Sequence, residues 1–482
     1  MNLKLVRSIS VYTILGFIPY ITSFLLLPIY TRFLSPIDYG IISLATVTES
    51  YFILFLVFGV SAAIVRFYNT YASQGREKLF LYNSIFITII TSVIAAICLF
   101  FWGDTIFNLV WKGNLSFEQF GFYIFSSCVV QALNQNLMQY FRIKEDLRSV
   151  ILVTLVPFIF SVAGIFTGVV ILNQGATGNI IGKFFGVTLS SLAMYVFIFK
   201  KNKTKIVIDP AIIKPVFLFS APIVLYYFLG SAADSLDRYF LNASYKLSDL
   251  GLYNFAKTII SPVEVIILAV WNAVIPVIYT FIHKNPDNKK LLTEYTSKYF
   301  DLILLIEFCI IGMALIFAEP IIKVISRPAF YPSAYYIPML ILSTLGRVYY
   351  ILYTFNIFYN KKTIFLPVIN SLSLIISIVV FNYMGNKFGI MGIAASTVIL
   401  KMTQFLIAYF FERHYDVKYP VAKAFPLLAA TLIAVPFFYY PALENIAVQY
   451  KIITGIFILG AGFYLYRHAL FKQDLKSTYI PT

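Results

Sequence analysis

Apolar runs long enough to cross a lipid bilayer recur along the whole chain and are separated by short polar connectors. A helix needs about 20 predominantly apolar residues to cross the hydrocarbon layer of a membrane. Runs of this size begin near residues 9, 40, 82, 117, 149, 177, 214, 250, 299, 332, 364, 389, 421 and 449. The pattern predicts an all-α integral membrane protein with about 14 transmembrane helices.

The composition agrees with this pattern. Of the 482 residues, 60% are hydrophobic and 12% are charged, whereas a soluble domain has about 25% charged residues. No polar stretch is long enough to form a separate soluble domain. The composition therefore excludes a soluble enzyme, a secreted disulfide scaffold and a disordered chain.

The 37 lysines and arginines, which give the chain a net charge of +16, are spread unevenly over the connectors. When the N-terminus, every second connector and the C-terminus are assigned to the cytoplasm, that side holds 25 of them and the opposite side holds 8. Cytoplasmic connectors carry an excess of Lys and Arg, so we expect both termini to be cytoplasmic. The charge follows from topology and requires no nucleic acid partner.

Two short motifs occur twice, at nearly the same spacing. An aspartate followed two residues later by a glycine stands at Asp38–Gly40 and again at Asp249–Gly251, 211 residues apart. A Gly-x-x-Gly motif stands at 175–178 and again at 389–392, 214 residues apart. Each motif opens a predicted span, and the order is the same in both parts of the chain, so we expect an internal duplication.

The duplication predicts the domain organisation. We expect a six-helix N-terminal lobe at 1–205 and a homologous six-helix lobe at 206–415. Two further transmembrane helices and a cytoplasmic tail would follow at 416–482. Because each lobe has an even number of spans, the two lobes should have the same orientation in the membrane.

Three segments near the N-terminus carry a family resemblance: Arg32–Gly40, Phe58–Val60 and Arg66–Tyr68. Together they resemble the N-terminal signature of bacterial polysaccharide-biosynthesis flippases, in the multidrug/oligosaccharidyl-lipid/polysaccharide exporter superfamily. Within the signature, we expect Asp38 and Gly40 to form a turn between spans. Asp38 would cap the next helix and Gly40 would supply an unusual φ.

The resemblance implies a fold and a function. The two lobes would surround a central cavity and move undecaprenyl-pyrophosphate-linked oligosaccharide from the cytoplasmic to the outer leaflet of the bacterial inner membrane. The transport unit would be a monomer in the lipid bilayer, working with a polymerase and chain-length machinery.

Basic residues inside the predicted spans are the candidate binding residues, because ionisable groups within a membrane normally face a cavity or a partner. Four lie within spans: Lys183, Lys257, Arg347 and Lys401. Arg32 and Arg238 lie near the outer ends of spans, and Arg66 lies on the cytoplasmic side. At the 214-residue offset, Lys183 corresponds to position 397, one helical turn from Lys401. We expect these cations to hold pyrophosphate or acidic sugars.

Acidic residues in the spans offer a second interpretation. Glu49 and Glu264 could bind a coupling ion or form ion pairs between helices, for example Glu264 with Lys257, and Glu307 is a further acid in the spans. Asp234 and Asp237, which share a helix face, could bind a coupling H⁺ or Na⁺, or could neutralise Arg238 and Lys257. The sequence leaves these alternatives open.

Other functions fit the sequence less well. The segment around Lys183 lacks the phosphate-binding pattern Gly-x₄-Gly-Lys-Ser/Thr, and Gly182 and Gly186 favour helix packing instead. With three histidines, we expect no catalytic triad, no metal site and no cofactor. A multidrug/cation antiporter would rely on an acid in the first span, where this chain has none, and a polymerase would need a large external loop. A peptidoglycan lipid-precursor flippase remains an alternative.

Overall fold

A computed structural model describes most of the chain: residues 26–201, 207–284, 288–359, 364–412 and 447–466, with a few isolated positions between them. Within these ranges the regular structure is helical throughout and includes no strand. The predicted all-α class is therefore confirmed.

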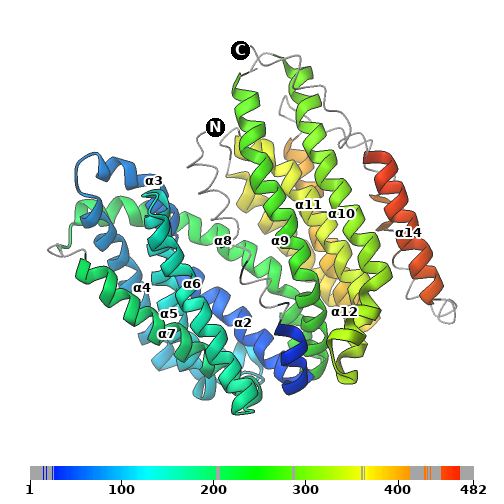
Figure 1. The fold of residues 1–482 in the computed structure, drawn as a ribbon, viewed down its shortest axis with the longest axis horizontal. Coiled ribbons are helices and arrows are strands. Elements are labelled where there is room, and N and C mark those ends of the chain that lie inside the picture. The colour runs from blue at the N-terminus through cyan, green and yellow to red at the C-terminus, as the bar shows by residue number, and fades with distance from the viewer. Residues whose placement is uncertain are drawn as a thin grey trace. The chain divides into compact units, whose positions relative to one another are not determined.

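The described helices are long and follow one another closely, as Figure 1 shows. In chain order they are α2 (Pro36–Val57), α3 (Val60–Ala72), α4 (Glu77–Trp111), η1 (Phe117–Gly121), α5 (Phe122–Ile143), α6 (Leu147–Phe166), η2 (Thr167–Ile171), α7 (Gly175–Lys201), α8 (Pro210–Ser244), α9 (Leu247–Lys284), α10 (Lys289–Ile325), η3 (Pro328–Tyr335), α11 (Ile337–Tyr359), α12 (Phe365–Glu412) and α14 (Ala447–Tyr466).

Nine stretches within the described residues are helical, long and apolar enough to cross a membrane. One of them, α12, contains two predicted spans, which meet at Gly389. Helices α5 and α14 coincide with the predicted spans near 117 and 449 but are not among the nine. The predicted spans near 9 and 421 lie largely outside the described residues. The protein is a multi-pass membrane protein, and the total of fourteen spans stays a prediction.

Helix α4 exposes several large apolar side chains. Phe100 is 82% exposed and Leu109 is 77% exposed, and Phe101 and Trp102 beside them are exposed as well. A soluble protein rarely exposes so many large apolar side chains together. These side chains are suited to contact lipid.

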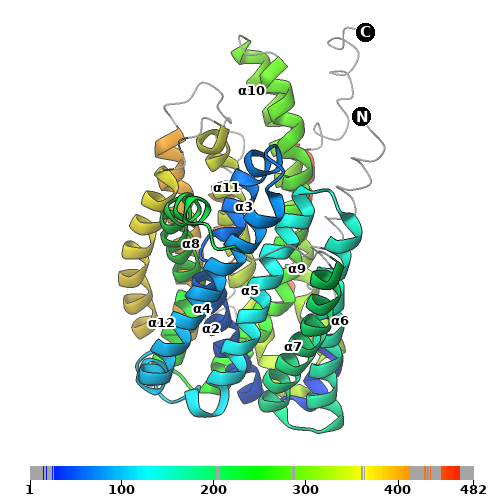
Figure 2. The same cartoon turned by 90° about the vertical axis from the view of Figure 1, so that its left-hand side faces the viewer.

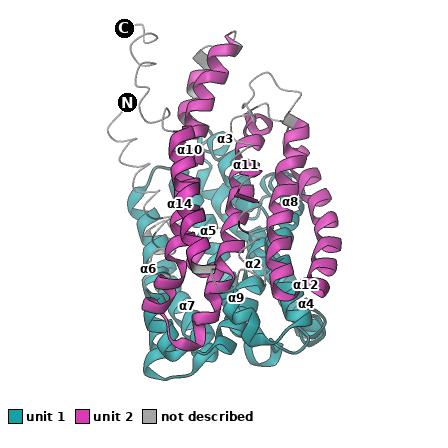
Figure 3. Cartoon of the chain, turned by 90° about the vertical axis from the view of Figure 1, so that its right-hand side faces the viewer, with its two compact units in different colours: residues 1–254 teal, residues 255–482 magenta. Residues whose placement is uncertain are grey.

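The chain divides into two compact units, residues 1–254 and 255–482, which Figure 3 colours separately. The division falls inside α9, and α8 packs with α2, α3 and α4 in the first unit. The predicted boundary at 205/206 concerns duplication, whereas these units reflect packing. The homologous lobes therefore stay a prediction.

In the first unit, α6 and α7 form a closely packed helical pair, side by side in Figure 2. A Cβ atom at Gly182 would lie 2.2 Å from the carbonyl oxygen of Gly164, and one at Gly186 would lie 2.1 Å from that of Phe160. Only glycine allows the two backbones to approach so closely. The predicted packing role of Gly182 and Gly186 is confirmed.

The signature segment begins α2 with a reciprocal cap. The Ser35 hydroxyl oxygen accepts from the backbone N–H of Asp38, and Asp38 Oδ2 accepts from the backbone N–H of Ser35 at 2.8 Å. This is the capping box that satisfies backbone donors at a helix start. Asp38 Oδ1 also accepts from the backbone N–H of Ala176, at 2.8 Å, in the first turn of α7. The predicted capping role of Asp38 is confirmed.

The expected turn at Asp38 and Gly40 was wrong, because both residues lie within α2. Gly40 lies within α2 and has no positive φ. It is needed because α9 crosses α2 here: a Cβ at Gly40 would lie 2.3 Å from the carbonyl oxygen of Leu247, and a Cβ at Gly251 would lie 1.7 Å from that of Pro36. Both glycines of the repeated Asp-x-Gly motif therefore serve one close helix crossing.

In the second unit, α11 and α12 make the most extensive contact, and α10 packs against α11, η3 and α14. The neighbouring positions of α10 and α14 are visible in Figure 3. Gly389 interrupts α12 with φ 67° and ψ −149°, a conformation that is essentially restricted to glycine. Gly175, the corresponding glycine of the other Gly-x-x-Gly motif, also has a positive φ of 56°.

Candidate functional site: paired charges within the helices

The first unit contains an ion pair between α2 and α7. Lys183 Nζ donates to Glu49 Oε2, and the two side chains are 26% and 10% exposed. These residues are 134 positions apart in the chain. Taking two charges out of water is costly, but leaving either one without its partner costs more. Lys183 and Glu49 therefore stabilise one another as a pair.

The second unit contains a similar pair between α9 and α11. Arg347 Nη1 lies 2.7 Å from Glu264 Oε2, and the side chains are 38% and 36% exposed. This pair is more accessible than Lys183–Glu49. Glu264 contacts Arg347, which is a different partner from the Lys257 considered from the sequence.

The two pairs have related positions and different partners. Glu49 and Glu264 belong to α2 and α9, the two helices that begin with the Asp-x-Gly motif. Glu49 pairs with a cation on α7, whereas Glu264 pairs with a cation on α11. The Lys183–Glu49 and Arg347–Glu264 pairs are thus built from non-equivalent helices.

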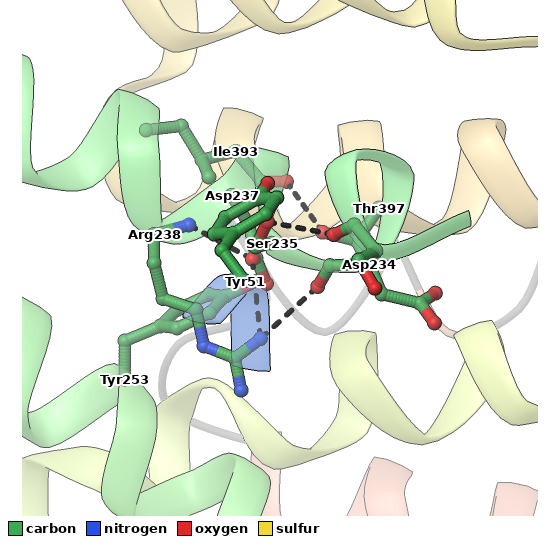
Figure 4. A network of polar contacts seen from close by, with 9 residues as sticks. Tyr51, Asp234, Ser235, Asp237, Arg238, Tyr253, Ile393 and Thr397 are labelled. Carbon is green, nitrogen blue, oxygen red and sulfur yellow. Dashed lines mark hydrogen bonds and ion pairs between the residues drawn. The ribbon is translucent and has the colours of Figure 1, made fainter. Parts of the chain in front are cut away.

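Asp234, Asp237 and Arg238 lie close together on α8, and Figure 4 shows them. Arg238 Nη1 donates to the carbonyl oxygen of Asp234 at 3.0 Å and lies 3.7 Å from Asp237 Oδ1. Asp237, 2% exposed, accepts from the Tyr253 hydroxyl at 2.9 Å and from the backbone N–H of Arg238 at 2.8 Å. Both carboxylate oxygens of Asp237 therefore have partners within the protein. Binding of a coupling ion by Asp234 and Asp237 stays a prediction.

The remaining candidate cations differ in environment. Lys257 is half-buried on α9, and Lys401 is buried on α12. A Cβ at Gly346 would lie 2.8 Å from Lys401 Cβ, so Lys401 packs against the residue that precedes Arg347. The structure thus brings the backbones of these two predicted site residues together where α11 and α12 meet.

Two further candidates, Arg32 and Arg66, belong to the first unit. Both are exposed, and within the described part of the chain neither forms an ion pair or a side-chain hydrogen bond. Arg66 belongs to α3, and Arg32 lies just before the Ser35 cap of α2.

Sequence reasoning missed the polar interior of α5. The Asn134 amide donates to the Ser191 hydroxyl at 2.9 Å, and the Asn136 amide donates to the Thr88 hydroxyl at 2.8 Å. Tyr195 donates to Asn134 Oδ1 at 2.6 Å. The signal was present in the sequence, because residues 131–139 contain five Asn or Gln side chains within a predicted span. Such side chains hydrogen-bond across helices in membranes.

Sequence reasoning also missed a polar cluster that joins the turn before α4 to the start of α8. Arg76 Nη2 lies 2.5 Å from Asp209 Oδ2, and the backbone N–H of Asp209 donates to Asn83 Oδ1 at 2.8 Å. Asp209 also caps α8. Arg76 is one of the 25 basic residues in the predicted cytoplasmic connectors, and no local pattern indicates its contact with Asp209, which is 133 positions away.

Solved structures of similar fold are transporters. The chain resembles a structure of the lipid II flippase MurJ in an inward closed conformation, with TM-score 0.64, 15% identity and coverage of 94% of this chain and 100% of that one. It also resembles an inward-facing multidrug resistance MATE family transporter of the MOP superfamily, with TM-score 0.65, 15% identity and coverage of 82% and 93%. A MOP superfamily transporter from Pyrococcus furiosus matches with TM-score 0.62, 15% identity and coverage of 84% and 95%.

Sequence comparison identifies the family. Protein 1 of the Lsg locus of Haemophilus influenzae is 23% identical over 395 residues, which cover 80% of this chain and 93% of that protein. Residues 5–282 match the family described as polysaccharide biosynthesis proteins, which is more than half of the chain. This chain therefore belongs to the polysaccharide biosynthesis protein family and has the fold of MOP superfamily transporters.

Proposed function

We propose that this protein is a flippase for lipid-linked oligosaccharide. It moves an undecaprenyl-pyrophosphate-linked repeat unit of a surface polysaccharide from the cytoplasmic to the outer leaflet of the bacterial cytoplasmic membrane, by alternating access. Membership of the polysaccharide biosynthesis family supports the substrate class. The fold that it shares with a lipid II flippase supports the transport of a lipid-linked sugar.

The observation that carries this proposal is the presence of paired cations inside membrane helices. A pyrophosphate group needs positive partners when it leaves water, and Lys183 and Arg347 are cations on membrane helices, each paired with a carboxylate. Phosphate oxygens can replace those carboxylates, and the planar guanidinium of Arg347 suits bidentate phosphate recognition. In the proposed mechanism, Glu49 and Glu264 hold the cations while substrate is absent and give them up to the pyrophosphate.

The charge pattern favours this function over export of cationic drugs. The first predicted span, residues 9–30, contains no Asp or Glu that could attract a cation. One structural neighbour, the Pyrococcus furiosus transporter, is described as having a binding pocket of reverse polarity that suggests a different function. From the paired cations of this chain, we infer a preference for an anionic substrate. A peptidoglycan lipid precursor has the same pyrophosphate chemistry, so the glycan must be identified by experiment.

The proposal includes the setting in which the transporter works. Both termini lie in the cytoplasm, a monomer is the transport unit, and a polymerase with its chain-length machinery uses the exported repeat unit. Transport is driven by H⁺ or Na⁺, or by the gradient of the substrate itself.

Removing an ion pair without leaving an unpaired charge tests the proposal. We expect the double variant Glu49→Gln/Lys183→Gln to reach the membrane at wild-type level and to lose export of the lipid-linked glycan. The measurement is accumulation of that glycan on the inner leaflet, in a bacterial host whose own flippase gene is deleted. If Lys183 served only to neutralise Glu49, the double variant would export normally, and the proposed role of Lys183 would be wrong.

The ion pair of the second unit provides an independent test of the proposal, and α10 provides a matched control. The double variant Glu264→Gln/Arg347→Gln should also lose export. Lys323 Nζ and Glu319 Oε1 form an ion pair at 2.8 Å on the exposed face of α10, and the variant Glu319→Gln/Lys323→Gln should export at wild-type rate. Equal losses in all three double variants would show that they disturb folding, and would contradict a specific role for Arg347.

A further inference from the structure

Glu307 is a carboxyl group buried inside the second unit. It lies on α10, its residue is 0% exposed, and its Oε2 atom has no hydrogen-bond partner among the described residues. An unpaired carboxylate is very unfavourable in such surroundings, and the usual solution is that the group stays neutral. The burial of Glu307 therefore favours the protonated acid.

The contact of Glu307 with α11 gives a geometric argument for a bound proton. Thr344 Oγ1 is 2.5 Å from Glu307 Oε1 and 2.6 Å from the carbonyl oxygen of Ile341. A hydroxyl group has only one hydrogen to donate. If Thr344 gave it to an ionised Glu307, its oxygen and the Ile341 carbonyl oxygen would lie 2.6 Å apart with no hydrogen between them.

Protonation of Glu307 removes this conflict. Thr344 then donates to the Ile341 carbonyl, which can only accept, and Glu307 donates its acid proton to Thr344 Oγ1. Both short contacts become hydrogen bonds of ordinary length for O–H donors. The result is a chain of two hydrogen bonds from the acid through the hydroxyl to the carbonyl.

The described groups around Glu307 do not offer it a cation. On α11, Arg347 lies one turn beyond Thr344 and is paired with Glu264 of α9. On α14, Tyr466 stacks against Phe308, which follows Glu307. The helix η3 contacts α10 but begins more than twenty residues after Glu307. Within the described residues, Glu307 forms no ion pair, so the proton is what neutralises it.

We propose that Glu307 is a proton-binding site. The proton is bound in this conformation, and it leaves when the α10–α11 contact opens and water reaches the carboxyl group. The O–H bond then breaks, the proton passes to water, and a carboxylate remains. If the protein is the flippase proposed above, this exchange couples transport to a proton gradient; the coupling rests on that function, whereas the occupancy of the site does not.

Infrared spectroscopy tests the occupancy directly. In the full-length protein reconstituted in lipid and labelled with ¹³C-glutamate, we expect the carbonyl stretch of a protonated glutamic acid at neutral pH. Glu307→Gln should abolish that band, and Glu319→Gln, an exposed glutamate of the same helix, should leave it unchanged. Persistence of the band in Glu307→Gln, or its absence from the wild type, would overturn the proposal. Neither result depends on which substrate is transported.

Substitution of Thr344 tests the proposed hydrogen bond, because a purely structural role of Thr344 would leave the position of the carbonyl band unchanged. Thr344→Val removes the acceptor of the acid proton, so the carbonyl band should shift to the position of a free acid. Thr344→Ser keeps the hydroxyl and should keep the band in place. An unshifted band in Thr344→Val would contradict the hydrogen-bond chain.

A transport assay then tests the coupling. Collapsing the pH gradient with a protonophore should lower export by the wild type. It should have no further effect on Glu307→Gln, which remains neutral throughout the cycle. If export by both proteins responds equally, Glu307 does not couple transport to protons, even where the infrared band is present. A protein that exports no glycan under any condition would instead contradict the proposed function.

Discussion

Asp38 shows how one side chain can fix the ends of two helices. It completes the capping box of α2 with Ser35 and accepts the backbone N–H of Ala176 at the start of α7. The helix starts at 36 and 175 are far apart in sequence, so the carboxylate holds two parts of the first unit in register. These two contacts explain the place of Asp38 in the signature segment.

The first prediction concerns this carboxylate. Asp38→Ala removes both caps, and because one cap contributes about 0.5–2 kcal/mol, we expect a loss of roughly 1–4 kcal/mol. The measurement is thermal unfolding of the purified protein in detergent. Asp38→Asn keeps one acceptor oxygen and should lose less. Equal melting temperatures for wild type and Asp38→Ala would show that these caps contribute nothing to stability.

The crossing of α2 and α9 gives a second prediction. In Gly251→Ala the new Cβ would lie 1.7 Å from the carbonyl oxygen of Pro36, so the helices must separate, at a cost of about 1–3 kcal/mol or more. We expect a lower melting temperature and less folded protein in the membrane. Gly460→Ala, where a Cβ meets nothing within 4 Å, is the matched control. A Gly251→Ala protein as stable as this control would contradict the crossing.

These two residues also show what the sequence could reveal. Asp38 follows a local rule, since a helix cap involves residues three positions apart, and its role could be predicted. Gly40 belongs to a contact between helices more than two hundred residues apart, and no local pattern distinguishes a packing glycine from a turn glycine. The same limit hid the partner of Lys183, because Glu49 is remote in the chain.

At the scale of elements, the helices could be predicted because apolar runs suit a membrane span, whereas their breaks could not. Left-handed backbone at Phe58 and Gly59 separates α2 from α3, inside what the apolar pattern presents as one span. Helix α5 is less apolar than its neighbours because its amides pair with α4 and α7. Both features depend on neighbouring helices, which a hydrophobic pattern does not record.

The break within α12 supplies the third prediction. Gly389→Ala forces a Cβ into a backbone conformation that only glycine adopts readily, and such strain costs of order 1–3 kcal/mol. We expect the variant to unfold at a lower temperature. Gly385→Ala, in the same helix, would place its Cβ 3.3 Å from a flexible Ile393 side chain and should change stability little. If the two variants unfold at the same temperature, the break does not need glycine.

At the scale of the whole molecule, the predicted orientation can be tested at the two ends of α4. This helix has 35 residues, and at 1.5 Å per residue it is roughly 50 Å long, enough to cross a membrane. Gln74 lies in the turn before α4 and Gln119 in η1 after it, and both are exposed. The distribution of Lys and Arg places the first turn in the cytoplasm and the second outside.

The fourth prediction uses this pair. In a background with Cys98, Cys128 and Cys309 replaced by serine, a membrane-impermeant thiol reagent added to whole cells should label Gln119→Cys. It should label Gln74→Cys only after the cells are opened. Labelling in the reverse order would place the termini on the outer side and would contradict the predicted topology.

The crossing of α2 and α9 also bears on how the chain arose. In a dimer with two-fold symmetry, a residue near the axis contacts its own counterpart in the other subunit. Gly40 and Gly251 are counterparts under the predicted duplication, and a Cβ at Gly251 would lie 2.9 Å from the backbone nitrogen of Gly40. Fusion of two copies of a self-associating ancestor would leave a contact of this form. On this view, an ancestral subunit interface survives within a single chain, with one glycine retained from each copy.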